Sequence, residues 1–223
     1  TLTFFEYNAL AAMWLLRERR LDFAVLEVGL GGRLDAVNIV DAEAAIVSSI
    51  GLDHADWLGT DIEQIGREKA GVFRAGSLAV IADPGMTPSV AAEAGRIGAR
   101  ALQAGSDYSW QVEEAGPRWS FRGAQQFDSL EPPALAGALQ YANAAAALAT
   151  LCGMGVSLRP DAINHALRSL QLPGRFQVVP GTVEWILDVA HNEPAVRVLA
   201  GNLCQRPCAG RTLVVTGILG DKD

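Results

Sequence analysis

The stretch LEVGLGGRLDAVN, residues 26–38, decides the fold of this chain. It continues an apolar run that begins at residue 23, and it places the carboxylate of Glu27 directly before a glycine-rich turn. A buried strand that ends at a polar turn is typical of ligand sites in open α/β sheets. The layout recurs where the apolar run 44–47 is followed by a polar cluster containing His54. We therefore expect two neighbouring strands whose carboxyl ends present Glu27 and His54 to one crevice.

Strands and helices alternate along most of the sequence. The expected helices span 3–19, 61–71, 88–100, 139–151 and 160–170, and a last helix begins near 194. The expected strands span 23–28, 44–50, 78–82, 183–189 and 212–216, with a hairpin within 108–122 at the sheet edge. Because the main strands are apolar without alternation, they indicate an α/β fold with a mostly parallel sheet flanked by helices.

Two of these helices begin with the pattern of a capping box. Thr3 and Glu6 have the required spacing, and Thr60 and Glu63 repeat it. The second helix should end at Gly71.

A break at Leu172-Pro173-Gly174 marks the expected domain boundary. Residues 1–172 form the first domain in this interpretation, 173–182 a linker, and 183–223 the start of a second α/β domain. Since the sequence starts without methionine and stops abruptly after a strand, we expect it to be part of a longer protein.

The composition favours small-molecule partners in the cytoplasm. A formal net charge of −7 and a pI near 5.0 leave no basic stripe for nucleic acid. The three cysteines form no C-x-x-C pair, and the chain has neither an apolar run long enough to span a membrane nor a signal-peptide pattern. Of the 18 basic side chains only two are lysines, Lys69 and Lys222.

The glycine turn does not match a dinucleotide fingerprint, because Leu34 occupies its sixth position and Asp35 lies too close to serve as the ribose acid. Glu27 is a candidate ligand at a strand end, or it caps a nearby helix. His54, beside Asp53, suits a divalent ion; a satisfied surface histidine is the alternative.

Ile62, Ile65 and Lys69 fall at i, i+3 and i+7 of the predicted helix, which places Lys69 along its apolar face. A buried ammonium is costly unless an acid pairs with it or its charge is removed. Reaction with carbon dioxide would convert it into a carbamate anion able to face metals. The alternative is a lysine that snorkels at the end of its helix.

Polar residues also follow the expected strand 183–189. Asp188 and His191 lie there, and Asn192 suits the cap of the helix that Pro194 begins. Arg175 follows the Pro-Gly break, where it either reaches a phosphate or lies on a solvated linker.

Together, six blocks in register carry a resemblance to a known family. They are TFFE (3–6), EVGLGGRLDA (27–36), SIGLDH (49–54), REKAG (67–71), LPGRF (172–176) and DVAHN (188–192). The chain resembles the folylpolyglutamate synthase family of the Mur ligase superfamily, and within it the bacterial bifunctional dihydrofolate synthase/folylpolyglutamate synthases.

The resemblance implies a P-loop-type ATPase domain that carries out ATP-dependent ligation of L-glutamate to dihydropteroate and to reduced folates through an acyl phosphate. It also implies a full-length protein that is a monomer, with no nucleic-acid or membrane partner, and two Mg²⁺ ions beside ATP. By similarity, Glu27 and His54 would be magnesium ligands and catalytic, and Lys69 would be carbamylated and catalytic. The residues implied for the pterin are Thr3, Phe4, Phe5, Glu6, Leu34, Asp35 and Ala36, and those implied for ATP are Asn143, Arg175 and Asp188.

The chain departs from that pattern in one important way. No G-x-x-x-x-G-K-[ST] loop occurs, so the phosphate cradle is missing from these residues and we expect them to be inactive alone. Val37 and Ala55 stand where many relatives would carry threonine. Alternative interpretations are a folylpolyglutamate synthase only, another Mur-type ligase, or a non-catalytic remnant domain.

Overall fold

The computed structural model describes residues 1–52, 58–206 and 208–218. Two compact units divide the chain. The first comprises Thr1–Ile81 and Gly85–Ala101, and the second comprises Ala82–Pro84 and Leu102–Asp223. Within the described residues, no helix is both long and apolar enough to cross a bilayer.

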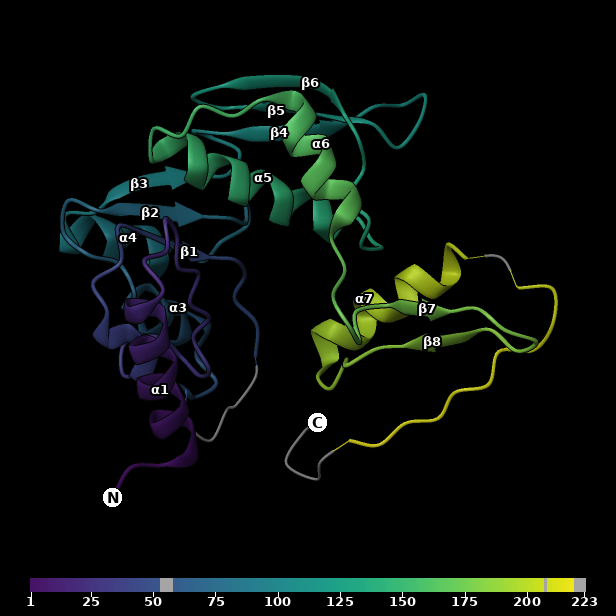
Figure 1. Ribbon diagram of the computed structural model, residues 1–223, viewed down its shortest axis with the longest axis horizontal. Helices are drawn as coiled ribbons and strands as arrows, with labels where there is room; N and C mark the ends of the chain where they lie inside the picture. Colours follow the sequence, from purple (N-terminus) through teal and green to yellow (C-terminus); the bar gives the residue numbers. More distant parts are fainter. Residues whose placement is uncertain (53–57, 207, 219–223) are drawn as a thin grey trace. The chain divides into compact units, whose positions relative to one another are not determined.

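A three-stranded sheet with the order β1-β2-β3 forms the centre of the first unit (Figure 1). Its elements are α1 (Phe4–Glu18), η1 (Ala36–Ile39), β1 (Ala44–Val47), α3 (Ile62–Ala70), β2 (Leu78–Ile81), α4 (Pro88–Ile97) and β3 (Arg100–Gln103), which runs across the boundary between the units. β1 and β2 pair in parallel, which confirms the expected α/β sheet. All four residues of β2 are buried, as a strand covered on both faces requires.

The core of the first unit forms where α3 and α4 pack on the sheet. Phe73, Ile81 and Val90 are almost fully buried in one cluster with small alanines from both helices. Burying an aromatic or branched side chain of this size stabilises a fold by roughly 1.5–3 kcal/mol. α4 ends at Gly98, whose φ of 77° is the left-handed C-cap that glycine adopts most easily, so the helix stops before the expected residue 100.

One of the two predicted capping boxes is present. The Glu6 amide donates to Thr3 Oγ1 at 3.2 Å, and the Thr3 amide donates to Glu6 Oε2 at 2.7 Å. The box predicted at Thr60 and Glu63 is wrong, because Asp61 is the N-cap and accepts the Glu63 amide at 2.9 Å. The Asp61 carboxylate, one residue later, provides the acceptor expected of Thr60 and sets the start of α3. The predicted end of the helix at Gly71 is confirmed.

The side chain of Glu63 is thereby free to join α3 to α4. It accepts hydrogen bonds from the Thr87 hydroxyl and, at 3.0 Å, from the Ser89 amide at the start of α4. Thr87 provides no cap of its own, so a carboxylate from a neighbouring helix caps α4. The Thr87 hydrogen bond, more than any other contact, holds the pKa of Glu63 below its ordinary value.

We expect this contact to make stability depend on pH. Because the pKa of Glu63 is lower in the folded state, the unfolded chain binds more protons near the ordinary glutamate pKa, and stability is lost as the pH falls through the lowered value. Between about pH 6 and about pH 3.5, Tm should therefore fall more for the wild type than for Glu63→Gln. Thermal unfolding followed by circular dichroism measures the difference, and equal falls in Tm would contradict it.

A second, antiparallel sheet with the order β4-β5-β6 organises the second unit. The elements of this unit are β4 (Ser109–Val112), β5 (Trp119–Arg122), β6 (Gln126–Leu130), α5 (Leu139–Gly153), α6 (Pro160–Ser169), β7 (Gln177–Val179), β8 (Trp185–Leu187) and α7 (Glu193–Cys204). The hairpin expected within 108–122 is confirmed as β4 and β5. Its expected place at the edge of the parallel sheet is wrong, because it pairs with β6 instead.

Buried aromatic side chains explain why this sheet is separate. Trp119 and Phe121 are fully buried on β5, and Phe121 stacks on Phe127 of β6 with ring centroids 6.2 Å apart. The Trp119 indole donates to the Glu131 carbonyl at 2.8 Å, and its ring meets Tyr141 of α5 edge to face. The aromatic side chains of β5 thus pack against Phe127 of β6, which lies beside it in the same sheet, and against Tyr141 of α5.

Two expected strands are absent from the described structure. Residues 23–28 and 212–216 are assigned to neither strand nor helix, and Val25 and Val215 are 95% and 92% exposed. A strand requires a hydrogen-bonded neighbour, and neither segment is paired in a ladder among the described residues. Strand 183–189 is confirmed in shortened form as β8, paired in antiparallel with β7, which lies within the segment expected to be a linker.

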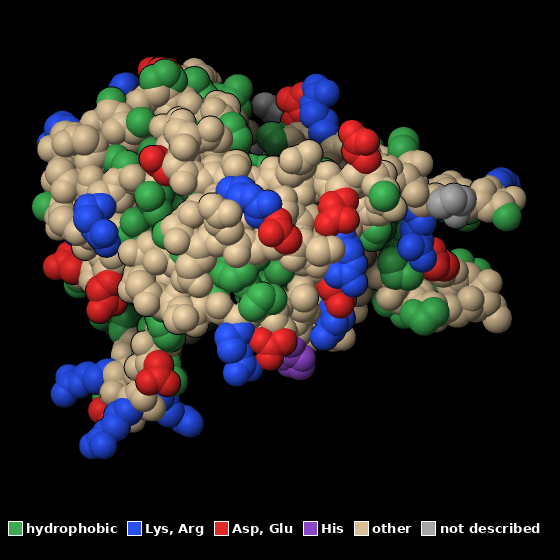
Figure 2. All heavy atoms as spheres, turned by 90° about the horizontal axis from the view of Figure 1, so that it is seen from above, with side chains coloured by type: hydrophobic (Ala, Val, Ile, Leu, Met, Phe, Trp, Pro, Cys, Tyr) green, Lys and Arg blue, Asp and Glu red, His purple; other side chains and the backbone are tan. Residues whose placement is uncertain are grey.

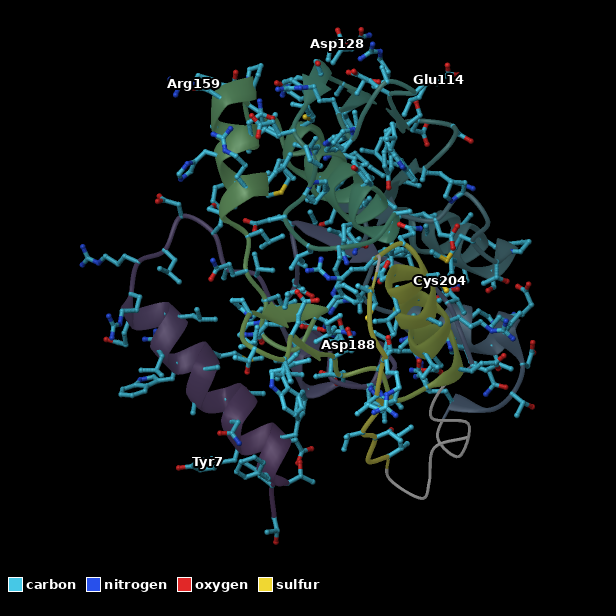
Figure 3. All side chains as sticks on the ribbon, turned by 90° about the vertical axis from the view of Figure 1, so that its right-hand side faces the viewer. Tyr7, Glu114, Asp128, Arg159, Asp188 and Cys204 are labelled. Atoms are coloured by element: carbon cyan, nitrogen blue, oxygen red, sulfur yellow. The ribbon has the colours of Figure 1, made fainter. Side chains whose placement is uncertain are left out.

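The surface carries both charges and apolar side chains. Figure 2 shows acidic and basic side chains interspersed over much of the face that it displays. α1 buries none of its residues: Phe4 is 87% exposed, and Tyr7 points away from the helix (Figure 3). The side chains of α1 are therefore at most partly buried in the described structure.

Candidate functional site

Asp35 closes the glycine-rich turn that follows Glu27. Its Oδ2 accepts the amides of Gly29 and Leu30, each at 3.0 Å, and its Oδ1 accepts the Val37 amide at 2.8 Å. The last bond makes Asp35 the N-cap of the short helix η1. Three backbone donors thus converge on one carboxylate, which fixes the path of the turn.

The same turn docks on the end of α3 at Lys69. A Cβ built on Gly32 would lie 2.7 Å from the Glu68 carbonyl oxygen and 2.8 Å from that of Lys69, so only glycine fits here. The Arg33 amide donates to the Glu68 carbonyl at 2.9 Å, and its guanidinium forks onto the Glu68 carboxylate. The structure therefore brings the glycine turn that follows Glu27 together with the end of the Lys69 helix.

A pocket of ≈ 400 Å³ opens between α1 and η1. Its lining combines apolar side chains with a few polar ones: Leu2, Glu6, Ala9, Leu10, Arg33, Leu34, Asp35, Ala36, Asn38 and Ile39. Both segments expected at the pterin contribute, although Thr3, Phe4 and Phe5 do not line it. Phe5 instead covers the turn, since a Cβ on Gly29 would lie 2.6 Å from the Phe5 ring.

Lys69 is half-buried one turn beyond the fully buried Ile65, in agreement with the predicted spacing. Its ammonium has no acidic partner among the described residues. Its neighbour Glu68 pairs with Arg33 and is not available to it.

The two expected magnesium ligands differ in what the structure describes. Glu27 is exposed and has no hydrogen-bond partner within the described part of the chain. His54 lies outside the described residues. Among described residues, no group of three or more His, Cys, Asp and Glu side chains is placed to hold a metal. A carboxylate and an imidazole together suit a divalent ion. Of the two expected ligands, only Glu27 lies among the described residues.

A second cluster forms where the turn at 172–176 meets the end of β8, marked by Asp188 in Figure 3. Asp188 accepts the amides of Phe176 and Ala190, each at 2.8 Å. The Val189 amide donates to the Gly174 carbonyl at 2.9 Å. Gly174 has a φ of 73°, and a Cβ there would lie 2.8 Å from Val189.

This cluster holds Arg175 beside Asp188, which the sequence predicted only as separate candidates. Arg175 is exposed, and its guanidinium has no partner within the described residues. Asn192 caps α7 by accepting the Ala195 amide at 3.0 Å, which confirms its predicted capping role. Asn143, the third residue expected at ATP, lies exposed on α5, and its amide donates to Gln140.

Two residues for which no role was predicted complete the cluster around the glycine turn. Asn38, the last residue of the quoted stretch, donates to the carbonyls of Arg33 and Gly71. Arg74 donates to the backbone and side-chain oxygens of Asn38. They are 36 residues apart, so no local pattern could have revealed the contact.

Comparison with known proteins places the whole chain beside one group of enzymes. No protein-family model matches the sequence. A dihydrofolate synthase/folylpolyglutamate synthase of Escherichia coli (strain K12) is 45% identical over 100% of this chain and 52% of its own length. The chain spans about half the length of the curated relatives it matches.

Solved structures agree with the sequence comparison. E. coli FolC in complex with DHPP and ADP has a TM-score of 0.92 at 45% identity, over 100% of this chain and 52% of that one. A bifunctional folylpolyglutamate synthase/dihydrofolate synthase with Mn, AMPPNP and L-glutamate bound has a TM-score of 0.83 at 45% identity, over 92% of this chain and 49% of that one.

Proposed function

Because this chain is related over its whole length, in sequence and in fold, to the dihydrofolate synthase/folylpolyglutamate synthases, we propose that it forms part of an ATP-dependent carboxylate–amine ligase. The ligase adds L-glutamate to dihydropteroate and to reduced folates. The observation that carries this proposal is the 45% identity extending across both clusters described above.

The reaction proceeds in two steps. A carboxylate oxygen of the pterin substrate attacks the γ-phosphorus of ATP, which forms an acyl phosphate and releases ADP. The amine of glutamate then attacks the acyl carbon, expels inorganic phosphate and loses a proton, and an amide results. Little covalent chemistry falls to the protein, so its task is to position substrates and stabilise charge.

The pocket between α1 and η1 is the proposed pterin site. Its volume falls within the range of small-molecule sites, and its apolar lining suits a flat heteroaromatic ring. Glu6 and Leu34–Ala36 line the pocket, from segments about 30 residues apart in sequence. The carboxylates of Glu6 and Asp35 already accept hydrogen bonds from backbone amides. We therefore propose that they hold the backbone around the pocket, and that backbone atoms contact the ring.

Lys69 is proposed to act as its carbamate. Lys69 is half-buried as a residue and its ammonium lacks an acidic partner among the described residues, which supports a state in which the positive charge is removed. An arginine could not form a carbamate, which suits the presence of lysine here in a chain whose basic side chains, apart from Lys222, are otherwise arginine. A lysine that snorkels at the helix end is the competing interpretation.

The remaining site residues are assigned by similarity and geometry together. Asn143, Arg175 and Asp188 are proposed at ATP, where the free guanidinium of Arg175 suits a phosphate and Asp188 holds the turn that presents it. Glu27 and His54 are proposed to hold Mg²⁺, which neutralises charge on the transferring phosphate when it is bound.

The proposed organisation follows the domain boundary read from the sequence. Residues 1–172 belong to the ATPase-type domain, 173–182 to a linker and 183–223 to the glutamate-ligase domain. We propose a cytoplasmic protein that is a monomer at full length.

Parallel assays of the full-length protein test the function. With ATP and glutamate, we expect product from dihydropteroate and from a reduced folate. Product from the reduced folate alone would indicate folylpolyglutamate synthase activity only. Turnover of a cell-wall precursor in place of both would indicate another Mur-type ligase, and no turnover of any of the three would favour a non-catalytic domain.

A further inference from the structure

Asn38 links the glycine turn to the end of the Lys69 helix. Its Nδ2 donates to the Arg33 carbonyl at 3.2 Å and to the Gly71 carbonyl at 3.0 Å. One carbonyl belongs to the turn that lines the pterin pocket, and the other belongs to the C-cap of α3. A single amide group therefore spans the two segments.

Arg74 fixes the orientation of that amide. Its Nη2 donates to Asn38 Oδ1 at 3.0 Å and to the Asn38 carbonyl at 2.6 Å. Since a guanidinium can only donate, the oxygen of the Asn38 side chain must face Arg74 and the nitrogen must face the two carbonyls. The orientation of Asn38 thus follows from the chemistry of its neighbours.

Arg74 is itself held in place. Its Nη1 lies 3.1–3.3 Å from the carbonyls of Gly71, Val72 and Phe73, and its Nε pairs with Asp41. The guanidinium therefore provides a donor to the carbonyl of the α3 C-cap, Gly71, and to those of the two residues that follow it. A lysine could not make this set of contacts, because it lacks the planar fork of donors.

We propose that Asn38, oriented by Arg74, is a positioning residue that fixes the pterin-pocket turn relative to Lys69. The inference rests on the proposed function, in which the pocket holds the pterin of the substrate and Lys69 acts in the reaction as its carbamate. Glycine at position 32 allows the turn and the helix to approach, and the Asn38 amide holds them in that arrangement. Asn38 acts through Lys69 and the turn.

Asn38→Asp is the sharpest variant, because the side chain keeps nearly the same shape while its hydrogen-bond donor becomes an acceptor. An oxygen would replace the donor that faces the carbonyls of Arg33 and Gly71, while the contact with Arg74 would survive. Arg74→Lys is the second variant, which keeps the charge and removes the fork. Glu63→Gln is the matched control, since it alters the opposite end of the same helix.

The first readout is hydrogen exchange in this chain, which requires no substrate. We expect amides 29–37 to exchange about tenfold faster in Asn38→Asp and Arg74→Lys than in the wild type, with β2 unchanged. Glu63→Gln should leave 29–37 as in the wild type. Unchanged exchange at 29–37 in both variants would overturn the inference, whatever the activity of the enzyme.

The second readout is a double-variant cycle in the full-length protein, measured well below the Tm of every variant. Asn38→Asp should lower kcat about tenfold, Glu63→Gln should not, and Asn38→Asp combined with Lys69→Ala should be no slower than Lys69→Ala alone. Losses that multiply would show that Asn38 does not act through Lys69 and would overturn the inference, with the proposed ligase function intact. Absence of any ligase activity in the wild type would instead overturn the proposed function, and exchange at 29–37 would still decide whether Asn38 fixes the turn.

Discussion

Lys69→Ala in the full-length protein should lower the rate of glutamate addition by about 100-fold, the size of effect seen when one preorganised electrostatic group is removed from an active site. The proposed carbamate supplies a negative charge that alanine cannot. Because alanine also leaves space at the end of α3, short carboxylates such as acetate should enter and restore part of the activity. Steady-state kinetics with and without added carboxylate measures both effects.

Lys69→Arg serves as the control for this rescue. It keeps a positive charge and fills the space, so it should be as slow as Lys69→Ala and gain nothing from added carboxylate. Wild-type activity in either variant without supplement would remove the carbamate from the mechanism. Rescue of both variants to the same degree would mean that the carboxylate acts elsewhere.

Features set by neighbouring residues could be predicted from the sequence. The capping box at Thr3 and Glu6, the helix end at Gly71 and the cap at Asn192 depend only on side chains within a few residues of the backbone they bind. The box predicted at Thr60 failed for an equally local reason, because Asp61 competes for the same role.

Features that depend on distant partners could not be predicted in the same way. Residues 23–28 have the composition of a strand, but they have no hydrogen-bonded neighbour among the described residues. The hairpin of β4 and β5 was visible from its alternation, whereas its third strand and separate sheet depended on the packing of Trp119 and Phe121. Pairing between strands is decided by packing across the sheet, which a single segment does not encode.

The candidate site shows the same division. The carboxylate before the glycine turn and the lysine on the helix face were identified from their positions in predicted elements. The contact between the glycine turn and the Lys69 helix was not predicted, because Asn38 and Arg74, which hold it, are joined by hydrogen bonds between residues 36 positions apart. His54 lies outside the described residues, so its part in the crevice stays a prediction.

Gly32→Ala should have the second large effect, this time on stability. The added Cβ would lie 2.7 Å from the Glu68 carbonyl oxygen and 3.0 Å from Lys69 Cα, which are backbone atoms that cannot move without shifting α3. Overpacking of this kind costs about 1–3 kcal/mol, which corresponds to a fall in Tm of roughly 2–12 °C for a chain of this size. Thermal unfolding of the 223-residue chain measures it.

Gly95→Ala is the matched control for that variant. A Cβ on Gly95 would meet nothing within 4 Å, and the residue lies within α4. Alanine is favoured over glycine inside a helix by roughly 0.5–1 kcal/mol, so Tm should stay level or rise. An unchanged Tm in Gly32→Ala would mean that the turn and α3 are not in close contact.

Transfer of ¹⁸O tests the proposed chemistry most directly. The full-length protein is supplied with ATP, glutamate and dihydropteroate whose carboxyl group carries ¹⁸O in both positions. If the carboxylate attacks the γ-phosphorus of ATP, one labelled oxygen leaves with each inorganic phosphate when glutamate displaces it. We predict one ¹⁸O in every phosphate released with product, whereas product formation with unlabelled phosphate would contradict the acyl-phosphate mechanism.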